Sequence, residues 1–325
     1  MSLPNPRTQW MHLPVPSKSF AGQTVIVTGS NIGLGLEAAR HFTRLQASKV
    51  ILAVRNIRAG EEAAKSIHES TGRNKVCEVW QVDIGNWESV KTFVKRAEGL
   101  ERLDVVVENA GVAKMDYSEL EGVESTIAVN VVGTFLMALG LLPILRASAK
   151  RTGETPRLTI VSSEVHKFTE LDERKEDSIF EALNKNDPKY MKKRYPASKL
   201  LEVFMVRALA PRMESGPHAN EPVILNMLNP GLCHSGLARD AKGFQGIVIA
   251  LLKFLLARTT EVGSRTLLAA AEAGKESHGK YMSNCVIDEP GPFVKSEEGK
   301  NTQERVYTEL MAILERIQPG ISNNI

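Results

Sequence analysis

The sequence predicts one α/β domain, built as a doubly wound parallel sheet of about seven strands with helices on both faces. Short β-branched runs alternate with longer amphipathic stretches along the chain, which is typical of strands joined by crossover helices. Several of the short runs are almost continuously apolar, as expected for strands that are buried on both faces. No linker, internal repeat or low-complexity tract divides the 325 residues, so we expect a single domain over residues 1–325.

The expected strands, in chain order, are TVIVT (24–28), KVILAV (49–54), VCEVWQV (76–82), LDVVVE (103–108), RLTIVS (157–162), PVILNML (222–228) and KYMSNCVI (280–287). The expected helices are amphipathic stretches at 34–46, 88–97, 122–146 and 196–213. The tail predicts one more helix, which closes the core with Val306, Leu310, Ile313, Leu314 and Ile317 on one face. We interpret 1–20 as an N-terminal extension, and the polar stretches at 168–193 and 236–260 as insertions.

Composition argues against several classes of function. The 41 basic and 38 acidic residues leave a net charge of +3, and there is no dense basic stripe with interleaved aromatics, so we expect no nucleic-acid partner. The three scattered cysteines include no CxxC pair, which argues against a disulfide framework and a metal site and favours a reducing, cytoplasmic compartment. The first twenty residues do not have the pattern of a secretory signal. The apolar run GFQGIVIALLKFLLA (243–257) is shorter than the roughly 18–20 residues that a membrane span needs, so we expect no span.

A glycine-rich turn follows the first expected strand, in TVIVTGSNIGLGLEAARHF. Gly29, Gly33 and Gly35 lie where the strand passes into a helix, and glycines there let backbone N–H groups approach an anion. The spacing is Gly-xxx-Gly-x-Gly rather than the better-known GxGxxG, but the strand–turn–helix context predicts a nucleotide site. We expect this site to include the intervening residues Ser30, Asn31 and Ile32.

The end of the second strand indicates which nucleotide binds. A carboxylate at this position usually holds a free ribose 2′-hydroxyl, but the sequence reads ILAVRN, with Arg55 and no Asp or Glu in reach. An arginine fork suits a 2′-phosphate, so the hypothesis is that NADP(H) is preferred over NAD(H). Arg58 and Ser30 are candidate further contacts. The alternative is an exposed arginine at a strand end.

The stretch RYPASKLLEVF (194–204) places Tyr195 one helical turn before Lys199. Positions i and i+4 share a helix face, so the ammonium group can approach the phenol. A nearby cation stabilises phenolate and lowers the pKa of a tyrosine from its usual value of about 10, which makes the phenol a competent proton donor or acceptor. The alternative is a surface tyrosine beside a surface lysine. We interpret the basic residues at 189–194 as a solvated approach to this helix.

TGSNIGLG (28–35) and YPASK (195–199) together resemble the short-chain dehydrogenase/reductase family, which has a Rossmann-type fold. Further motifs follow in the family's order. The resemblance implies that the residues which hold the cofactor include Asp83 on the adenine, Asn109, Ala110 and Gly111 of ENAG, and Pro230, Gly231 and Ser235 of the turn after the sixth strand. It also implies a catalytic set formed by Asn130, Ser163, Tyr195 and Lys199.

In that set, Tyr195 would donate a proton to the developing alkoxide as hydride arrives from the nicotinamide, and Ser163 would hydrogen-bond the same oxygen. Lys199 would reach the nicotinamide ribose, and Asn130 would anchor a water that relays protons to Lys199. VILAVRN, TTEVGSRTLL and GKYMSNC look like the branch that includes retinol dehydrogenases. Tailoring reductases of fungal secondary metabolism include similar chains.

Two departures from the family pattern stand out. Glu108 replaces the first asparagine of the usual NNAG, and either adds a carboxylate below the cofactor or changes a turn contact. The spacer between Ser163 and Tyr195 is also longer than usual. His166 could suggest a Ser–His hydrolase, but no G-x-S-x-G elbow precedes it, so we interpret it as a loop or pocket-wall residue. His234 beside Cys233 lacks further metal ligands.

In this family the segment after the Pro-Gly turn covers the substrate, which assigns residues 236–260 to a lid. Its apolar residues suit a bulky hydrophobic ketone, aldehyde or alcohol, such as a polyketide, terpenoid or retinoid-like compound. A dimer contact and a membrane-surface helix are the alternatives. We therefore predict an NADP(H)-dependent carbonyl reductase. The alternatives are a non-redox NADP(H)-binding enzyme (isomerase-like or cyclase-like) and a nicotinamide-sensing binding protein. The oligomeric state stays open, with a homo-oligomer among the alternatives.

Overall fold

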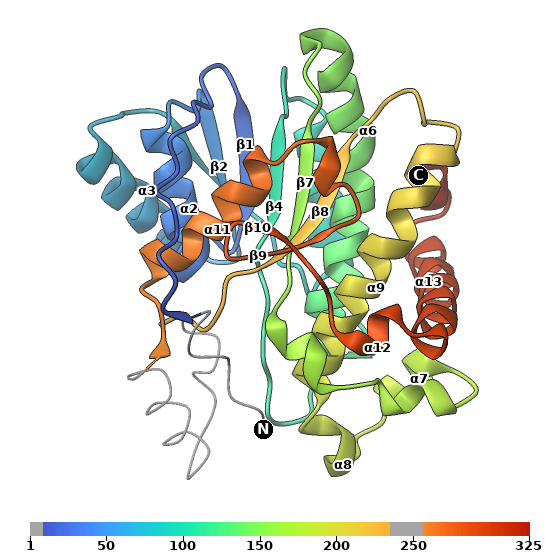
Figure 1. Cartoon of the computed structure of the whole chain (residues 1–325). Coiled ribbons are helices and arrows are strands. Elements are labelled where there is room, and N and C mark those ends of the chain that lie inside the picture. Colours follow the sequence, from blue (N-terminus) through green and yellow to red (C-terminus); the bar gives the residue numbers. More distant parts are fainter. Residues whose placement is uncertain (1–8, 235–255) are drawn as a thin grey trace.

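A central sheet of eight strands organises the computed structural model, which describes residues 9–234 and 256–325 (Figure 1). From one edge to the other the strands are β3 (Cys77–Gln81), β2 (Lys49–Val54), β1 (Thr24–Thr28), β4 (Val105–Glu108), β7 (Arg157–Val161), β8 (Ile224–Asn229), β9 (Tyr281–Ser283) and β10 (Val286–Asp288). All neighbours from β3 to β9 pair in parallel. The predicted doubly wound α/β fold is confirmed.

The last expected strand, at 280–287, is wrong as a single element, because the segment forms a hairpin. β9 and β10 pair antiparallel, with Ser283 opposite Val286. The two residues between them, Asn284 and Cys285, have φ values of 52° and 67°. Two consecutive residues with positive φ are characteristic of the tight hairpin turn that matches the twist of the strands, and Asn is among the residues that tolerate this conformation best. The sheet therefore has eight strands, with one antiparallel edge.

Helices cover both faces of the sheet, and strand residues alternate between the two cores. Ile26 and Val106 point into one core, and Val27 and Val107 point into the other. The first core is covered by α4 (Trp87–Ala97), α6 (Thr134–Thr152), α9 (Arg194–Ser215) and α13 (Glu297–Ile317). The second core is covered by α2 (Gly33–Arg44), α3 (Ile57–Thr71) and α11 (Thr260–Glu272).

The expected helices at 34–46, 88–97 and 196–213 correspond to α2, α4 and α9. The expected helix at 122–146 begins instead with a short strand, β6 (Val123–Glu124), which pairs with β5 (Glu119–Leu120). One continuous helical stretch follows, made of α5 (Ser125–Ile127), the π-helical η1 (Ala128–Gly133) and α6. This stretch is long and apolar enough to cross a membrane, but 89% of its most apolar window is buried inside the fold, so it is a core element.

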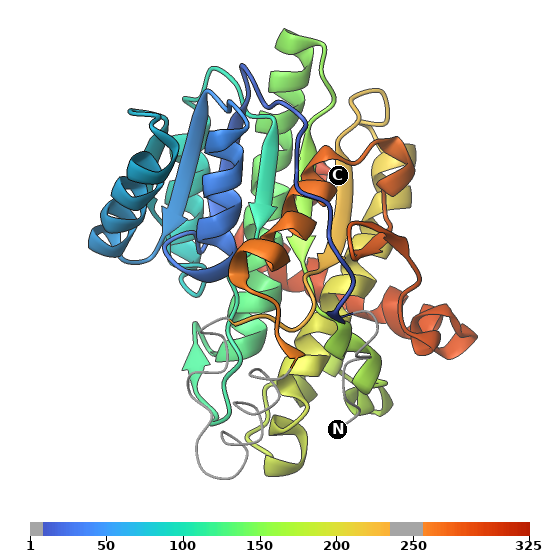
Figure 2. The same cartoon turned by 60° about the vertical axis from the view of Figure 1, so that its left-hand side comes forward.

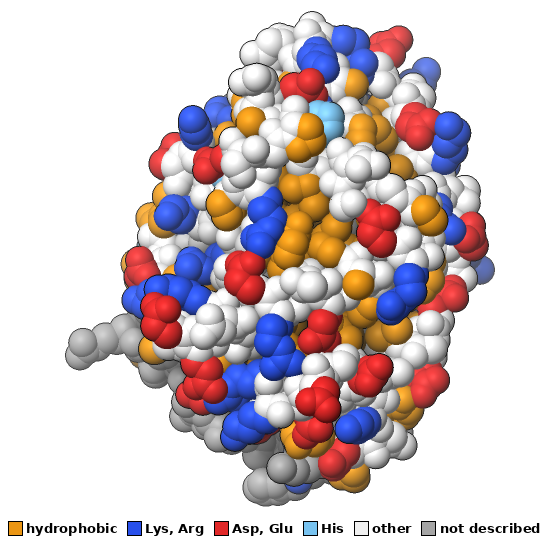
Figure 3. All heavy atoms as spheres, turned by 90° about the vertical axis from the view of Figure 1, so that its right-hand side faces the viewer, with side chains coloured by type: hydrophobic (Ala, Val, Ile, Leu, Met, Phe, Trp, Pro, Cys, Tyr) orange, Lys and Arg blue, Asp and Glu red, His pale blue; other side chains and the backbone are white. Residues whose placement is uncertain are grey.

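The C-terminal helix α13 closes the first core, as the spacing of its apolar residues predicts, and it packs against α9. Val306, Leu310 and Leu314 are buried in the first core. The remaining short helices are η2 (Glu164–Phe168), η3 (Asp172–Lys175), α7 (Ile179–Leu183), α8 (Pro188–Met191), η5 (Lys275–Ser277), α12 (Pro292–Lys295) and η6 (Ile321–Asn324). The side of the molecule that carries α13 and α7 mixes acidic and basic side chains around a hydrophobic area (Figure 3).

The described part of the N-terminal extension runs along the outside of α11 (Figure 2). The Arg265 guanidinium donates to the backbone O of Leu13 at 2.8 Å, and Lys18 Nζ donates to the backbone O of Glu272 at 3.3 Å. Leu13 and Phe20 are themselves buried. The extension is thus fixed to the second core by its apolar side chains and by bonds to its backbone.

Candidate active site

The glycine-rich turn forms a tight corner between β1 and α2. Gly33 has a φ of 66°, in the left-handed region that favours glycine. A Cβ at Gly35 would lie 2.5 Å from Asn109 Nδ2 and 2.7 Å from the backbone O of Gly29, so no side chain fits there. Helix α2 begins without a side-chain cap, which leaves its first backbone N–H groups available to an anion. This cradle fits the phosphates of a dinucleotide.

The loop after β4 is tied to the same corner. Thr28 Oγ1 accepts hydrogen bonds from the backbone N of Asn109 at 2.8 Å and of Ala110 at 2.9 Å. Asn109 Nδ2 donates to the backbone O of Thr28 at 2.8 Å. Thr28 and Asn109 therefore bring the predicted loop residues 109–111 against the glycine turn. Asp83 follows β3 by two residues, and its carboxylate accepts from the backbone N of Gly85 at 3.0 Å.

The candidate contacts to a 2′-phosphate have different surroundings. Arg55 is exposed directly after β2. Arg58, also exposed, lies 3.5 Å from Glu62 in an ion pair. Ser30 is buried and donates to the backbone O of Val27 at 2.8 Å. The role of Ser30 at a 2′-phosphate stays a prediction, and its hydroxyl stabilises the corner through the bond to Val27.

Tyr195 and Lys199 lie in the first turns of α9, where Lys199 is buried and Tyr195 is partly buried. Lys199 Nζ is 5.8 Å from the centre of the Tyr195 ring, and it donates to the backbone O of Val161 at 3.0 Å. Burial raises the pKa of Tyr195 above its usual value, although the Lys199 ammonium and the Ser163 hydroxyl act to lower it. The expectation of a net lowering is thus wrong for these residues alone, because desolvation outweighs the cation. The alternative of a surface pair is also wrong.

Asn130 connects the loop after β4 to α9. Its Oδ1 accepts from the backbone N of Val112 at 2.8 Å, and its Nδ2 donates to the backbone O of Val112 at 2.9 Å and to Ser198 Oγ at 3.0 Å. A Cβ at Gly111 would lie 3.2 Å from Asn130 Oδ1 and 3.8 Å from Lys199 Nζ. The side-chain amide of Asn130 thus holds two parts of the site together, and its polar atoms already bond to protein groups.

These residues converge at the carboxyl ends of β1, β4 and β7, the usual ligand edge of a doubly wound sheet. Comparison with known proteins identifies the family of the chain. Residues 23–167 match the family model for short chain dehydrogenases. A short chain dehydrogenase/reductase from Cryptosporiopsis, dmxR8, is 46% identical over 318 residues, which cover 96% of each chain.

The chain belongs to the short-chain dehydrogenase/reductase family. The short-chain dehydrogenase anuD of Penicillium roqueforti is also similar, at 45% identity over 95% of this chain and 81% of its own. Among solved structures, an uncharacterized protein from Mycobacterium Paratuberculosis superposes with a TM-score of 0.67 at 27% identity, over 93% of this chain and 95% of that one. Members of this family are oxidoreductases that use a nicotinamide cofactor.

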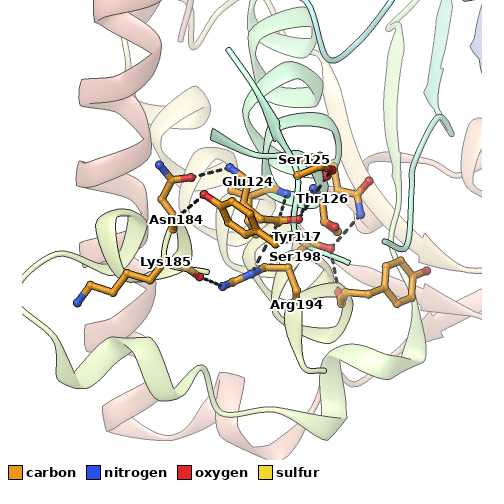
Figure 4. Close-up of polar contacts among 12 residues, drawn as sticks. Tyr117, Glu124, Ser125, Thr126, Asn184, Lys185, Arg194 and Ser198 are labelled. Carbon is orange, nitrogen blue, oxygen red and sulfur yellow. Dashed lines mark hydrogen bonds and ion pairs between the residues drawn. The ribbon is translucent and has the colours of Figure 1, made fainter. Parts of the chain in front are cut away.

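Arg194, immediately before Tyr195, is the centre of a buried ion cluster (Figure 4). Its Nη1 is 3.0 Å from Glu173 Oε1, and its Nε is 3.7 Å from Glu124 Oε2. Glu124 also accepts from the backbone N of Thr126 and of Ile127, at the start of the helical stretch that carries Asn130. The interpretation of 189–194 as a solvated cluster is therefore wrong for Arg194, which ties the long spacer to both catalytic helices.

Glu108, the residue that departs from the family's NNAG motif, is buried at the end of β4. Its Oε1 has no hydrogen-bond partner among the described residues. Burial raises the pKa of Glu108 to about 8, although a contact with Thr28 lowers it in part. The carboxyl is therefore protonated at neutral pH and lies beside the turn residue Thr28.

His166 is a core residue rather than a loop or pocket-wall residue. Its Nε2 accepts from the backbone N of Gly291 at 2.9 Å, and its Nδ1 lies 2.7 Å from the backbone O of Ser163. These contacts assign the proton to Nδ1, which donates to Ser163 O. Burial lowers the pKa of His166 to about 4. His166 thus supports the backbone of Ser163 and is not placed as a hydrolase base.

The Pro-Gly turn after β8 is held by Arg258. The guanidinium donates to the backbone O of Pro230 at 3.2 Å, to the backbone O of Gln9 at 3.2 Å and to Asn284 Oδ1 at 2.6 Å. The turn thereby connects the N-terminal extension with the β9–β10 hairpin. Ser235 and most of the predicted lid at 236–260 lie outside the described residues.

Proposed function

We propose that this dehydrogenase is an NADP(H)-dependent reductase of bulky hydrophobic ketones or aldehydes, working in the cytoplasm. The carrying observation is the convergence of Tyr195, Lys199 and Ser163 beside a glycine corner that fits a dinucleotide. The bound cofactor would supply hydride to the carbonyl carbon. All other groups that the reaction needs are contributed by the chain.

Tyr195 is the proton donor in this proposal. The Ser163 hydroxyl and the Lys199 ammonium both act on the Tyr195 phenol, so a carbonyl oxygen that contacts Tyr195 would also meet a second hydrogen-bond donor in Ser163. The Tyr195 O–H bond breaks and the proton passes to the substrate oxygen, while the Lys199 charge stabilises the phenolate that remains. Asn130 and Arg194 hold the helices on which these groups lie.

The choice of NADP(H) rests on Arg55, which is exposed at the end of β2 where no acidic residue lies in reach along the sequence. A guanidinium fork favours a phosphate on the ribose over a free hydroxyl. The choice of a hydrophobic substrate, such as a polyketide or terpenoid, rests on the apolar sequence at 243–257, which we assign to the lid. The cytoplasmic location rests on the three scattered cysteines.

The deciding experiment compares Tyr195→Phe with the wild type. We expect NADPH affinity, measured by nicotinamide fluorescence, to be unchanged, and NADPH-dependent reduction of a hydrophobic ketone panel to fall at least ~100-fold, the usual scale of general acid catalysis. Small polar sugars should be poor substrates. A variant that reduces the same ketones at the wild-type rate would refute the proposed role of Tyr195.

A further inference from the structure

Glu202 is a buried carboxylate on α9, the helix that carries Tyr195 and Lys199. The motifs that indicate the family do not include Glu202. It lies one turn after Lys199 on α9 and is 2% exposed. Its Oε1 is 2.7 Å from Lys199 Nζ, and its Oε2 has no hydrogen-bond partner among the described residues. A carboxylate in such surroundings is costly unless a cation compensates it, and Lys199 is that cation.

The pair changes the charge that Tyr195 experiences. An isolated Lys199 ammonium would place a full positive charge beside the phenol, which favours phenolate. The Glu202 carboxylate cancels much of this charge, and it acts to raise the pKa of Tyr195 while Lys199 acts to lower it. Burial raises the pKa of Glu202 to about 7, so the carboxyl is ionised at the alkaline pH where a phenol titrates.

Among the residues that the structure describes, few other ionisable groups act on this pair. From β7, the hydroxyl of Ser162 lies next to Glu202 and donates to the backbone O of Lys199 at 3.0 Å. The 3-10 helix η2, which packs on α9, carries Glu164, His166 and Lys167. His166 is neutral near pH 7 because burial lowers its pKa to about 4. From β9, Tyr281 faces His166, and burial raises the Tyr281 pKa far above neutrality.

We propose that Glu202 is a positioning residue that neutralises the Lys199 charge and thereby keeps Tyr195 a proton donor, biasing this active site toward carbonyl reduction. The inference rests on the proposed function and adds the direction in which the active site favours the reaction. Reduction consumes the Tyr195 proton, which passes to the substrate oxygen as hydride passes to the carbon. Alcohol oxidation needs the reverse transfer, for which the phenolate must already be present.

The first test titrates the Tyr195 phenol in the protein without added cofactor, from the ultraviolet absorbance of phenolate. The signal of Tyr195 is the difference between each protein and the same protein carrying Tyr195→Phe. We expect Glu202→Gln to lower the pKa of Tyr195 by at least about one unit, because the opposing charge is removed. Glu202→Asp, which retains the charge, should return the pKa toward the wild-type value.

Two controls isolate the cause. Glu214→Gln removes an exposed carboxylate from the same helix and should leave the titration unchanged. Lys199→Met combined with Glu202→Gln should abolish the downward shift, because the shift arises from the Lys199 charge. Circular dichroism at each pH confirms that the proteins compared are folded. A Tyr195 titration in Glu202→Gln that coincides with the wild type overturns the proposal.

The second test measures both reaction directions against pH. In Glu202→Gln, alcohol oxidation should become fast at a lower pH than in the wild type, and ketone reduction should be lost at a lower pH. If the wild type neither binds NADPH nor reduces ketones, the proposed function fails even when the Tyr195 titration shifts. If the wild type reduces ketones and the titration does not shift, only the role of Glu202 fails.

Discussion

The guanidinium of Arg194 lies 3.0 Å from the carboxylate of Glu173, and both side chains are buried. The neighbouring pair, Lys193 and Asp172, is 2.8 Å apart but partly exposed. Two ion pairs of the same type therefore connect η3 to the start of α9, one inside the protein and one at its surface. Because their cations are neighbours in the sequence, substituting each cation in turn compares the contribution of a buried ion pair with that of an exposed one.

Arg194→Met should destabilise the protein by about 3–5 kcal/mol, because it leaves Glu173 and Glu124 buried without their cation. It should also lower kcat more than it raises the KM for NADPH, since Arg194 orients the helix that carries Tyr195. Urea denaturation and steady-state kinetics measure the two effects.

Lys193→Met is the matched control for this prediction. Removing one partner of an exposed ion pair costs about 0–1 kcal/mol, so its unfolding midpoint and kcat should stay near the wild type. Equal losses of stability in the two variants would contradict the account of Arg194 as a buried centre of charge.

Gly35→Ala should abolish tight binding of either nicotinamide nucleotide. The added methyl would lie 2.5 Å from Asn109 Nδ2 and 2.7 Å from the backbone O of Gly29, so the corner must open. Fluorescence titration with NADPH should show at least a ~10-fold weaker Kd, whereas Gly153→Ala, at the C-terminal end of α6, should bind as the wild type does. Wild-type affinity in Gly35→Ala would exclude the glycine corner as the phosphate cradle.

Arg55→Ala should weaken NADPH binding about 10-fold or more while changing NADH binding little, because only NADPH carries the phosphate that the guanidinium would bind. Arg58→Ala is the control, since Arg58 already pairs with Glu62 and should contribute less. Titrating both proteins with both nucleotides gives the affinity ratio. An unchanged ratio in Arg55→Ala would mean that NADP(H) preference, if present, has another origin.

Most of the sheet could be predicted because its strands are β-branched runs separated by polar or glycine-containing segments. The run at 280–287 was predicted as one strand because its residues alternate without an obvious break. Only two residues, Asn284 and Cys285, make the turn that divides it. Tyr195 and Lys199 could be paired from sequence because one helical turn fixes their relation. The net pKa shift of Tyr195 could not, since it depends on how deeply the phenol is buried.

The burial and the partners of the charged residues that support the site could not be predicted from the sequence for a related reason. Arg194 appears in the sequence as part of a basic, solvated run, and its burial results from Glu124 and Glu173, which are distant along the chain. Glu202 appears as a polar residue within an apolar helix, a pattern that does not reveal which partner it meets. Only the packing of α9 against η2 and the bond from Lys199 to Val161 of β7 settle these surroundings.

Glu108 should make the stability of the protein fall as pH rises toward 8. Burial raises its folded pKa to about 8 from an ordinary value near 4.5, so the native state binds a proton that the unfolded state has released. The neutral carboxyl contributes fully to the free energy of unfolding at a pH below the pKa of Glu108 in the unfolded state. This contribution is lost as the pH rises through the pKa of Glu108 in the folded state. The contribution of Glu108 to the free energy of unfolding should therefore decline between about pH 5 and pH 8.

Glu108→Gln removes this ionisation while keeping a side chain of similar shape. We expect its stability relative to the wild type to increase by at least about 1 kcal/mol between pH 5.5 and pH 8.5, as one pKa unit corresponds to about 1.4 kcal/mol. Urea denaturation of both proteins at the two pH values gives the difference, and Glu202, which also titrates near neutrality, cancels because both proteins retain it. Parallel stability curves would show that Glu108 is ionised in the folded protein, and that a cation or water compensates it.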